Sequence, residues 1–176
     1  MIRKATIRDL DAVASVYDHI HSAEESGAIT TGWIRGIYPV RETALAALSR
    51  GDLFVQTDEI QGKETVVGTA ILNQVQVDVY KDASWRYDVP DSQVMVLHTL
   101  AIDTNVKGCG YGRKFEEYYR QYAIKNGCRY LRIDTNVRNR DARGFYKKLG
   151  YEEVDILPCE FNGIPGVELV LLEKKI

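Results

Sequence analysis

The chain has 176 residues, of which 45% are hydrophobic and 27% are charged, a composition typical of an ordinary water-soluble domain. Its formal net charge of −2 argues against a general nucleic-acid binder, which would present a basic surface. The three cysteines have neither the spacing of a zinc site nor that of a disulfide framework, and no apolar run is long enough to span a membrane. We therefore expect one domain over residues 1–176, in the cytoplasm, with no metal ion, nucleic acid or membrane as its partner.

The first half of the chain predicts a strand, two helices and a β-hairpin. In chain order these are a strand at 2–6, helices at 10–26 and 41–50, and hairpin strands at 53–57 and 65–79 around the turn-prone residues 58–63. The pattern from Thr6 to Asp9 resembles a capping box, which starts the first helix, and Gly51 ends the second. Residues 80–93 contain tryptophan and proline and are predicted to form a loop.

An aromatic loop is predicted between the two helices, at residues 29–39. It has two glycines, a proline and no sustained hydrophobic period. Trp33, Ile37 and Tyr38 make it unusually apolar, so it either anchors on the hydrophobic core or lines a pocket. Anchoring is the simpler interpretation, and both remain open at this point.

The stretch from Val94 to Arg113 is the most informative part of the sequence. Residues 94–102 form a nearly continuous apolar run, which predicts a strand buried on both faces. After a polar break, aromatic residues recur with the spacing of an amphipathic helix at positions 115, 118, 119 and 122. Three glycines lie at the start of this helix, where they permit close backbone approach and where free N–H groups favour a phosphate: Gly108, Gly110 and Gly112.

The last third of the chain continues the alternation of strands and helices. It predicts a strand at 130–136, a helix at 142–149 stopped by Gly150, a strand at 151–157, a loop at 158–166 and a strand at 167–173. Together with the earlier elements, this order predicts an α+β fold in a three-layer arrangement. Its seven-stranded, partly antiparallel sheet is covered by helices.

A dinucleotide-binding fold is an alternative explanation of the glycines. Asp134 lies at the end of the next predicted strand, where an acid that binds a ribose would be expected. The glycines are spaced G-x-G-x-G, however, which is one residue short of the dinucleotide fingerprint, and antiparallel strands precede them. Both observations disfavour this alternative.

Two motifs give the chain a family resemblance. Residues 107–112, KGCGYG, fit the pattern Arg/Gln-x-x-Gly-x-Gly/Ala with lysine in the first position. Residues 139–151 fit the pattern Asn-x-x-Ala-x-x-Phe-Tyr-x-x-Leu-Gly-Tyr/Phe through Asn139, Ala142, Phe145, Tyr146, Leu149, Gly150 and Tyr151. In this order the motifs resemble those of the GNAT superfamily of N-acetyltransferases, most firmly over residues 94–154. The resemblance implies a mixed, mostly antiparallel sheet with splayed central parallel strands.

The resemblance also implies which residues hold acetyl-CoA. They are Leu100, Ala101, Ile102, Lys107, Gly108, Cys109, Gly110, Tyr111, Gly112, Arg113, Asn139 and Tyr146. The backbone N–H of Leu100 would stabilise the oxyanion, and Tyr146 would act as general acid toward the departing thiolate, a role that suits a phenol with a pKa near ~10. Asn139 would cap its helix and contact the cofactor.

His98 is the candidate general base, but the pattern also allows a buried core histidine. By the two-residue period of a strand it is expected to face the same side as Leu100 and Ile102. Val96 occupies a position that often carries Glu or His in this superfamily, which leaves the base open. Glu24 and Glu25 could replace His98 or bind a cationic acceptor, but on sequence alone they form a solvated helix face.

The sequence thus predicts an enzyme that transfers an acetyl group from acetyl-CoA to a primary amine of a small molecule by direct attack in a ternary complex. Two alternatives remain. One is a GNAT-like module that binds acyl-CoA as a sensor without turnover, and the other is an N-acetyltransferase acting on a protein or peptide. A homodimer is compatible with all three.

Overall fold

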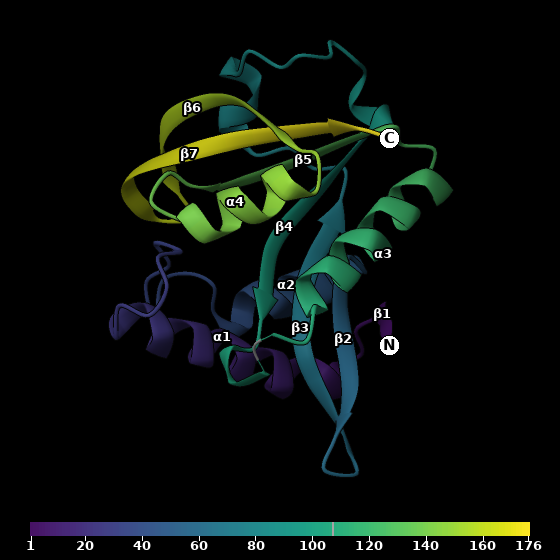
Figure 1. Cartoon of the computed structure of the whole chain (residues 1–176), viewed down its shortest axis with the longest axis vertical. Coiled ribbons are helices and arrows are strands. Elements are labelled where there is room, and N and C mark those ends of the chain that lie inside the picture. Colours follow the sequence, from purple (N-terminus) through teal and green to yellow (C-terminus); the bar gives the residue numbers. More distant parts are fainter. Residues whose placement is uncertain (107) are drawn as a thin grey trace.

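The computed structural model describes residues 1–106 and 108–176 (Figure 1). The strands are β1 (Ile2–Lys4), β2 (Leu53–Ile60), β3 (Lys63–Asn73), β4 (Val94–Ile102), β5 (Tyr130–Asn136), β6 (Glu152–Phe161) and β7 (Ile164–Lys175). The helices are α1 (Leu10–Glu25), α2 (Arg41–Arg50), α3 (Tyr111–Lys125) and α4 (Arg140–Lys148). The predicted α+β class, strand number and helix positions are confirmed.

The seven strands form one sheet in the order β1-β2-β3-β4-β5-β7-β6, and every neighbouring pair is antiparallel except β4 and β5. Helices α3 and α4 pack on one face of the sheet, through residues such as Phe115 and Tyr146. Helices α1 and α2 pack on the opposite face against β2 and β3. The loops before α2 and before β4 complete this second layer over β4 and β7.

The two central parallel strands diverge, as the family resemblance implies. Pairing between β4 and β5 extends only from Val94 with Tyr130 to Leu97 with Ile133. Beyond that point β4 continues beside β3, while β5 continues beside β7. Figure 1 shows the resulting V-shaped opening in the middle of the sheet.

A β-bulge in β4 lies directly beyond the last pair. Thr99 has a φ of 53°, and the register against β3 shifts by one residue between His98 and Ala101. Because of this extra residue, Leu100 packs on the α3 face with Met95 and Leu97. The expectation that His98 and Leu100 share a face is therefore wrong, since the strict two-residue period holds only for an unbulged strand.

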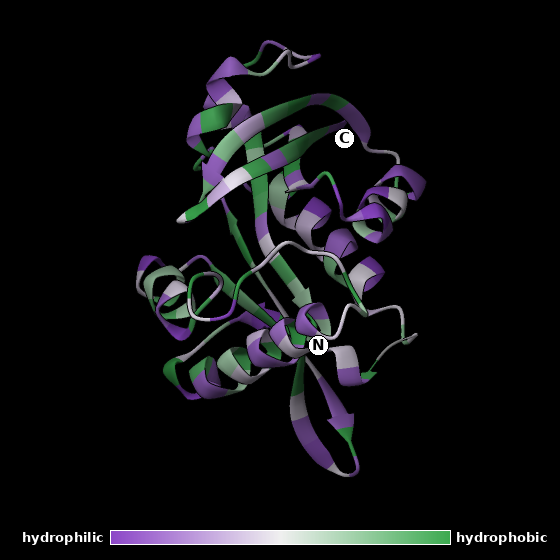
Figure 2. Ribbon diagram, turned by 90° about the vertical axis from the view of Figure 1, so that its left-hand side faces the viewer, coloured by the Kyte–Doolittle hydropathy of each residue, from purple (hydrophilic) through white to green (hydrophobic). Residues whose placement is uncertain are grey.

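Both hairpins have tighter turns than the sequence analysis predicted. The β2–β3 turn consists of Gln61 and Gly62 alone, both with positive φ, so the strands extend into the predicted turn at 58–63. This hairpin projects from the molecule with a largely hydrophilic tip (Figure 2). The predicted loop at 158–166 is likewise a two-residue turn, Asn162–Gly163, and Pro158 is tolerated inside β6 because β6 is an edge strand.

The predicted strand at 65–79 is too long at its C-terminal end. Strand β3 ends at Asn73, whose side-chain Oδ1 accepts a hydrogen bond from the Val75 N–H at 2.9 Å. This local turn replaces the next ladder bond. The chain then forms a short 3₁₀ helix at Asp78–Asp82.

Candidate active site

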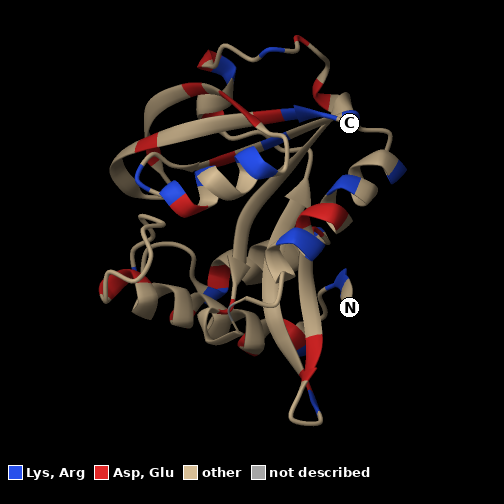
Figure 3. Cartoon of the chain, in the orientation of Figure 1, with Lys and Arg blue, Asp and Glu red and all other residues tan. Residues whose placement is uncertain are grey.

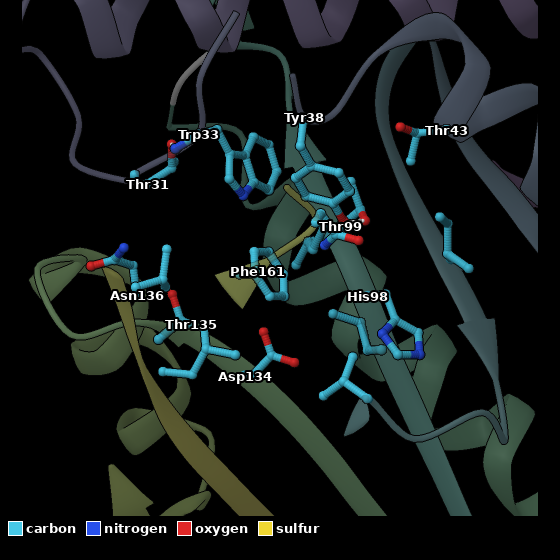
Figure 4. A pocket seen from close by; sticks show the side chains of 18 of the residues that line it. Thr31, Trp33, Tyr38, Thr43, His98, Thr99, Asp134, Thr135, Asn136 and Phe161 are labelled. Atoms are coloured by element: carbon cyan, nitrogen blue, oxygen red, sulfur yellow. Dashed lines mark hydrogen bonds between the residues drawn. The ribbon is translucent and has the colours of Figure 1, made fainter. Parts of the chain in front are cut away.

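A pocket of about 730 Å³ lies where β4 and β5 diverge (Figure 4). Its walls come from the loop before α2, from β4 and β5, from the start of α4 and from the β6–β7 hairpin. Four of the predicted site residues line it: His98, Leu100, Asn139 and Tyr146. The pocket thus brings together residues of the motif at 139–151 with residues from parts of the chain that neither motif covers.

Beyond Leu97, the edge of β4 that faces β5 has no paired strand among the described residues. The Asp103 N–H donates to the Val67 carbonyl of β3 at 2.9 Å. Successive N–H groups of a strand point to opposite sides, so those of Ile102 and Leu100 point toward the open edge that β5 has left. This is the geometry that an oxyanion-binding donor at Leu100 requires.

Tyr146 is almost fully buried in α4, with 5% of its surface exposed, and it lines the pocket. Its ring packs edge-on against Tyr151, with centroids 5.5 Å apart. Within residues 1–106 and 108–176 its hydroxyl has no hydrogen-bond partner. Burial raises the pKa of this phenol well above its ordinary value, and the nearby carboxylates of Asp134 and Glu116 raise it further. Tyr146 therefore keeps its proton until a strong base forms beside it.

Asn139 caps α4, as predicted from the motif. Its side-chain Oδ1 accepts a hydrogen bond from the Ala142 N–H at 3.2 Å, and the residue also lines the pocket. The cap fixes the first turn of the helix that carries Tyr146.

His98 is held by its neighbours as a neutral side chain. Its Nε2 lies 3.0 Å from both Asn73 Oδ1 and the Val75 carbonyl oxygen, and because both are acceptors, Nε2 carries the hydrogen. Burial lowers the pKa of the imidazole to about 4, although the Val75 carbonyl partly offsets this effect. His98 is thus a weak base whose ring ties the end of β3 to β4.

We expect His98→Ala to act on stability more than on the pH dependence of the rate. The wild-type ring is neutral when folded but has an ordinary pKa when unfolded, so it stabilises the fold above pH ~6.5 and loses this effect as the pH falls toward 4. Losing its hydrogen bonds should cost about 1–3 kcal/mol at pH 7. Urea unfolding at pH 7 and pH 5 measures both effects. An activity limb that disappears in His98→Ala while stability is unchanged would contradict this assignment.

Asp134 is the acidic residue of the pocket lining, and its sequence position suggested only a ribose-binding acid. It lies on β5, and Tyr80 donates its hydroxyl hydrogen to Oδ2 at 2.8 Å. Burial raises the pKa of this carboxyl to about 6, and the Tyr80 hydrogen bond partly opposes the rise. No local motif distinguished Asp134, because its role depends on the divergence of β4 from β5.

Aromatic side chains form the wall opposite β5. Trp33 and Tyr38 meet edge-on with ring centroids 5.9 Å apart, and Tyr38 meets Phe161 in the same way at 5.4 Å (Figure 4). All three line the pocket, and they also pack against the core cluster over β4 and β7. The two interpretations of the aromatic loop are therefore both correct.

The acidic residues at the end of α1 hold this loop and are not part of the pocket lining. The Glu24 carboxylate accepts hydrogen bonds from the Thr31 N–H at 2.5 Å and the Thr31 hydroxyl at 2.9 Å. Glu25 pairs with Arg35 at 2.8 Å. Both carboxylates thus anchor the loop, and neither is placed to act as the general base in the pocket.

The glycine loop adopts a backbone conformation that favours glycine. Gly108 and Gly110 have φ values of 83° and 71°, in the left-handed region, and Gly110 is the residue before α3. Gly112 serves packing instead, because a Cβ there would lie 3.3 Å from Phe145 Cζ of α4. Lys107, the first residue of the predicted loop motif, lies outside the described residues.

Tyr111, Cys109 and the basic residues that follow them differ in how accessible their side chains are to a ligand. Tyr111 is buried, and its hydroxyl donates to Asp58 Oδ2 at 2.8 Å, so only its backbone remains for a cofactor. Cys109 is exposed. Arg113 and Lys114 place positive charge in the first turn of α3, whereas the first turn of α4 has both Arg140 and Asp141 (Figure 3).

Neither a membrane segment nor a metal centre is found in the part of the chain that the structure describes. None of its helices has the length and apolar character needed to cross a membrane. No group of three or more histidine, cysteine, aspartate or glutamate side chains in that part clusters as metal ligands do.

The model of the acetyltransferase (GNAT) family matches residues 15–151. The chain belongs to this family. Over 76 residues it is 30% identical to an uncharacterized N-acetyltransferase of Methanocaldococcus jannaschii, a match that covers 43% of this chain and 34% of that relative. The chain thus spans about a third of that relative's length.

Solved GNAT structures share the fold over nearly their whole length. A GNAT-family acetyltransferase from Streptococcus agalactiae 2603 superposes with a TM-score of 0.76 at 20% identity, covering 100% of this chain and 95% of that one. A ribosomal-protein-alanine N-acetyltransferase from Brucella melitensis superposes with a TM-score of 0.68 at 20% identity, covering 100% of this chain and 99% of that one. At these identities the likeness concerns the fold.

The geometry fits the acetyl-CoA that the GNAT family generally uses. In the described residues α3 begins without a side-chain cap, so its first N–H groups remain available to a pyrophosphate. The open edge of β4 offers peptide groups to an extended arm, and it leads from this helix end to the pocket.

Proposed function

We propose that this GNAT protein transfers the acetyl group of acetyl-CoA to a primary amine of a small molecule, by direct attack within a ternary complex. The observation that carries the proposal is the convergence in one pocket of an open strand edge, a phenol with no bonding partner among the described residues, and a carboxylate. The strand edge supplies a hydrogen-bond donor for the oxyanion, the phenol supplies a proton donor, and the carboxylate supplies a proton acceptor. Acylation of an amine requires all three groups.

The protein's groups divide this work as follows. When bound, acetyl-CoA supplies the activated acetyl thioester. The Leu100 N–H stabilises the negative charge that develops on the acetyl oxygen, and Ala101 and Ile102 hold the pantetheine arm by their peptide groups. Tyr146 gives its hydroxyl proton to the departing sulfur. The Gly108–Gly112 loop, with Arg113, binds the pyrophosphate.

The size of the pocket and its aromatic wall favour a small acceptor over a peptide. Its volume of about 730 Å³ lies in the range of small-molecule sites. Trp33 and Phe161 approach it from segments far apart in sequence and narrow the space in which an extended chain would lie. We also propose a reducing compartment such as the cytoplasm, because the three cysteines of the sequence lack the spacing of a disulfide framework.

A panel assay tests the proposed function. Purified protein is mixed with acetyl-CoA and with single amines or with N-terminally free peptides, and both free thiol and the mass of the acetylated product are measured. The proposal expects thiol release that is stoichiometric with an acetylated amine. Transfer to peptides alone would redirect it to a protein substrate, and tight acetyl-CoA binding without any transfer would favour a sensor.

The glycine loop gives a separate prediction for acetyl-CoA binding. Valine at Gly110 strains the left-handed backbone and covers the N–H groups of α3, so we expect calorimetric affinity to fall at least ~10-fold. Gly62→Val is the matched control, because Gly62 has a φ of 76° in the remote β2–β3 turn. Equal affinity in both variants would show that the loop does not bind the cofactor.

A further inference from the structure

We propose that the acceptor is a hydrophobic amine with a single positive charge, and that Asp134 both binds its ammonium group and removes its proton. The inference rests on the proposed function and names the substrate class of the same pocket. It also places the general base on β5, whereas the sequence suggested His98 of β4.

The first observation is the position of the Asp134 carboxylate. Asp134 lines the pocket, and the Tyr80 hydroxyl fixes one carboxylate oxygen, Oδ2, at 2.8 Å. Its other oxygen, Oδ1, has no hydrogen-bond partner among the described residues, so it is available to a ligand. The carboxylate is close enough to raise the pKa of both Tyr38 and Tyr146 electrostatically. Asp134 thus lines the same pocket as the aromatic wall and the proton donor Tyr146, and Figure 4 shows its carboxylate below the Phe161 ring.

The second observation is the charge balance of the pocket lining. Among the lining residues, Asp134 is the one carboxylate, and His98 is neutral. Arg50 also reaches the pocket, but its guanidinium pairs with Asp52 at 3.0 Å. A second ammonium group on the acceptor would thus be desolvated without a counter-charge, which is costly. The site selects one positive charge.

The third observation is the apolar character of the remaining wall. Trp33, Tyr38 and Phe161 surround the space above Asp134, and Figure 4 shows their rings turned toward it. Aromatic faces attract both hydrocarbon and an ammonium group. Further apolar lining comes from Ile37, Val167 and Leu169. The body of the acceptor is therefore hydrophobic.

The groups that face Asp134 allow it to act near neutral pH. Tyr80 of the 3₁₀ helix bonds Asp134 directly, and Tyr38 of the loop, Tyr146 of α4 and Cys159 of β6 interact with it electrostatically; all four are uncharged at pH 7. Arg132 lies two residues before Asp134 on the same face of β5, but its charge is paired with Glu173. With a pKa of about 6 the carboxylate is mostly ionised at pH 7, yet it is a stronger base than an exposed aspartate. The rate should rise as the pH rises through 6.

The proton balance of the step is complete without another reactant. The ammonium group passes one proton to Asp134, and the freed nitrogen lone pair forms the C–N bond as the C–S bonding pair leaves on sulfur. Sulfur takes the Tyr146 hydroxyl proton, and the second nitrogen proton, lost as the amide forms, restores Tyr146. Asp134 then releases its proton to solvent.

The test measures binding as well as transfer. Calorimetry without acetyl-CoA compares 2-phenylethylamine, the uncharged 2-phenylethanol and the doubly charged putrescine, on wild type and on Asp134→Asn. We expect wild type to prefer 2-phenylethylamine, with an affinity that falls below pH 6, and Asp134→Asn to weaken it about 10–100-fold. Asp88→Asn, which removes an exposed carboxylate outside the pocket lining, is the matched control.

The pH profile of transfer supplies an independent measurement. In wild type the acid limb of kcat/KM should lie near pH 6 for acceptors of different pKa, and Asp134→Asn should remove it. Tyr80→Phe deletes the hydrogen bond that lowers the pKa of Asp134, so it should move the limb to higher pH. A merely structural role of Tyr80 would not produce this shift of the acid limb. The shift would therefore identify Tyr80 as a positioning residue.

Failure of the inference is distinguishable from failure of the proposed function. Transfer to putrescine as fast as to 2-phenylethylamine, or wild-type amine affinity in Asp134→Asn, would overturn the inference while acetyl transfer stands. Asp134-dependent amine binding with no thiol release for any amine would overturn the proposed function, while the assignment of the ammonium site stands.

Discussion

Tyr146→Phe is expected to lower turnover by about 10²–10⁴-fold, the usual contribution of general acid catalysis, while acetyl-CoA affinity stays within about threefold. The phenol keeps its proton because its pKa is raised, and it has no hydrogen-bond partner among the described residues that would be lost in the variant. Steady-state thiol release and calorimetry measure the two quantities. Tyr118→Phe is the control, since it removes a hydroxyl from α3 outside the pocket lining.

An unchanged turnover number in Tyr146→Phe would show that Tyr146 contributes only to packing. In that case the departing sulfur would have to take its proton from solvent. A sulfur that leaves without a proton donor leaves as a thiolate, so the rates of both wild type and variant would then rise with the acidity of the leaving thiol. Acetyl esters of thiols more acidic than CoA test this dependence.

The largest expected loss of stability concerns Glu173→Gln. Arg132 of β5 and Glu173 of β7 form an ion pair at 3.1 Å, with side-chain exposures of 5% and 1%. Removing one charge leaves the other buried and unpaired, which costs about 3–5 kcal/mol. The Glu173 carboxylate also accepts the backbone N–H of Arg86 at 3.1 Å, so the variant should loosen the loop before β4 as well.

Urea unfolding measures this loss, and Glu168→Gln on the same strand is the matched control because Glu168 is exposed. The Arg132 guanidinium also lies 4.0 Å from the Trp85 ring centroid and donates to the Tyr87 carbonyl at 3.1 Å. A loss below about 1 kcal/mol, the value of an exposed pair, would mean that water reaches the charge in solution.

Much of the fold was predictable because its signals are local. The apolar run of β4, the helical stripe of α3 and the stop at Gly150 each depend on a few neighbouring residues. The Asn162–Gly163 turn was also marked in the sequence by a strong hairpin dipeptide, although the loop prediction overlooked it. The bulge at Thr99 had no such mark, because it arises from how β4 pairs with β3.

The candidate site divides in the same way. Asn139 and Tyr146 belong to a motif within one helix, so the sequence identified them, and both line the pocket. Asp134 and Tyr80 lie far apart in the chain, and their contact depends on the sheet and on the preceding loop. The raised pKa of Asp134 depends on its burial in the folded structure, so no spacing of residues in the sequence could predict it.

The anchored loop at 29–39 has a consequence for the kinetics of acceptor binding. Tyr38 is hydrogen-bonded to Thr99 of the bulge, Glu24 holds Thr31, and the His21 ring lies 2.9 Å from the Pro39 carbonyl oxygen. The wall that an amine meets is already in its final shape, so little ordering entropy opposes binding. Related amines should then share similar association rates, and selectivity among them should appear as differences in residence time.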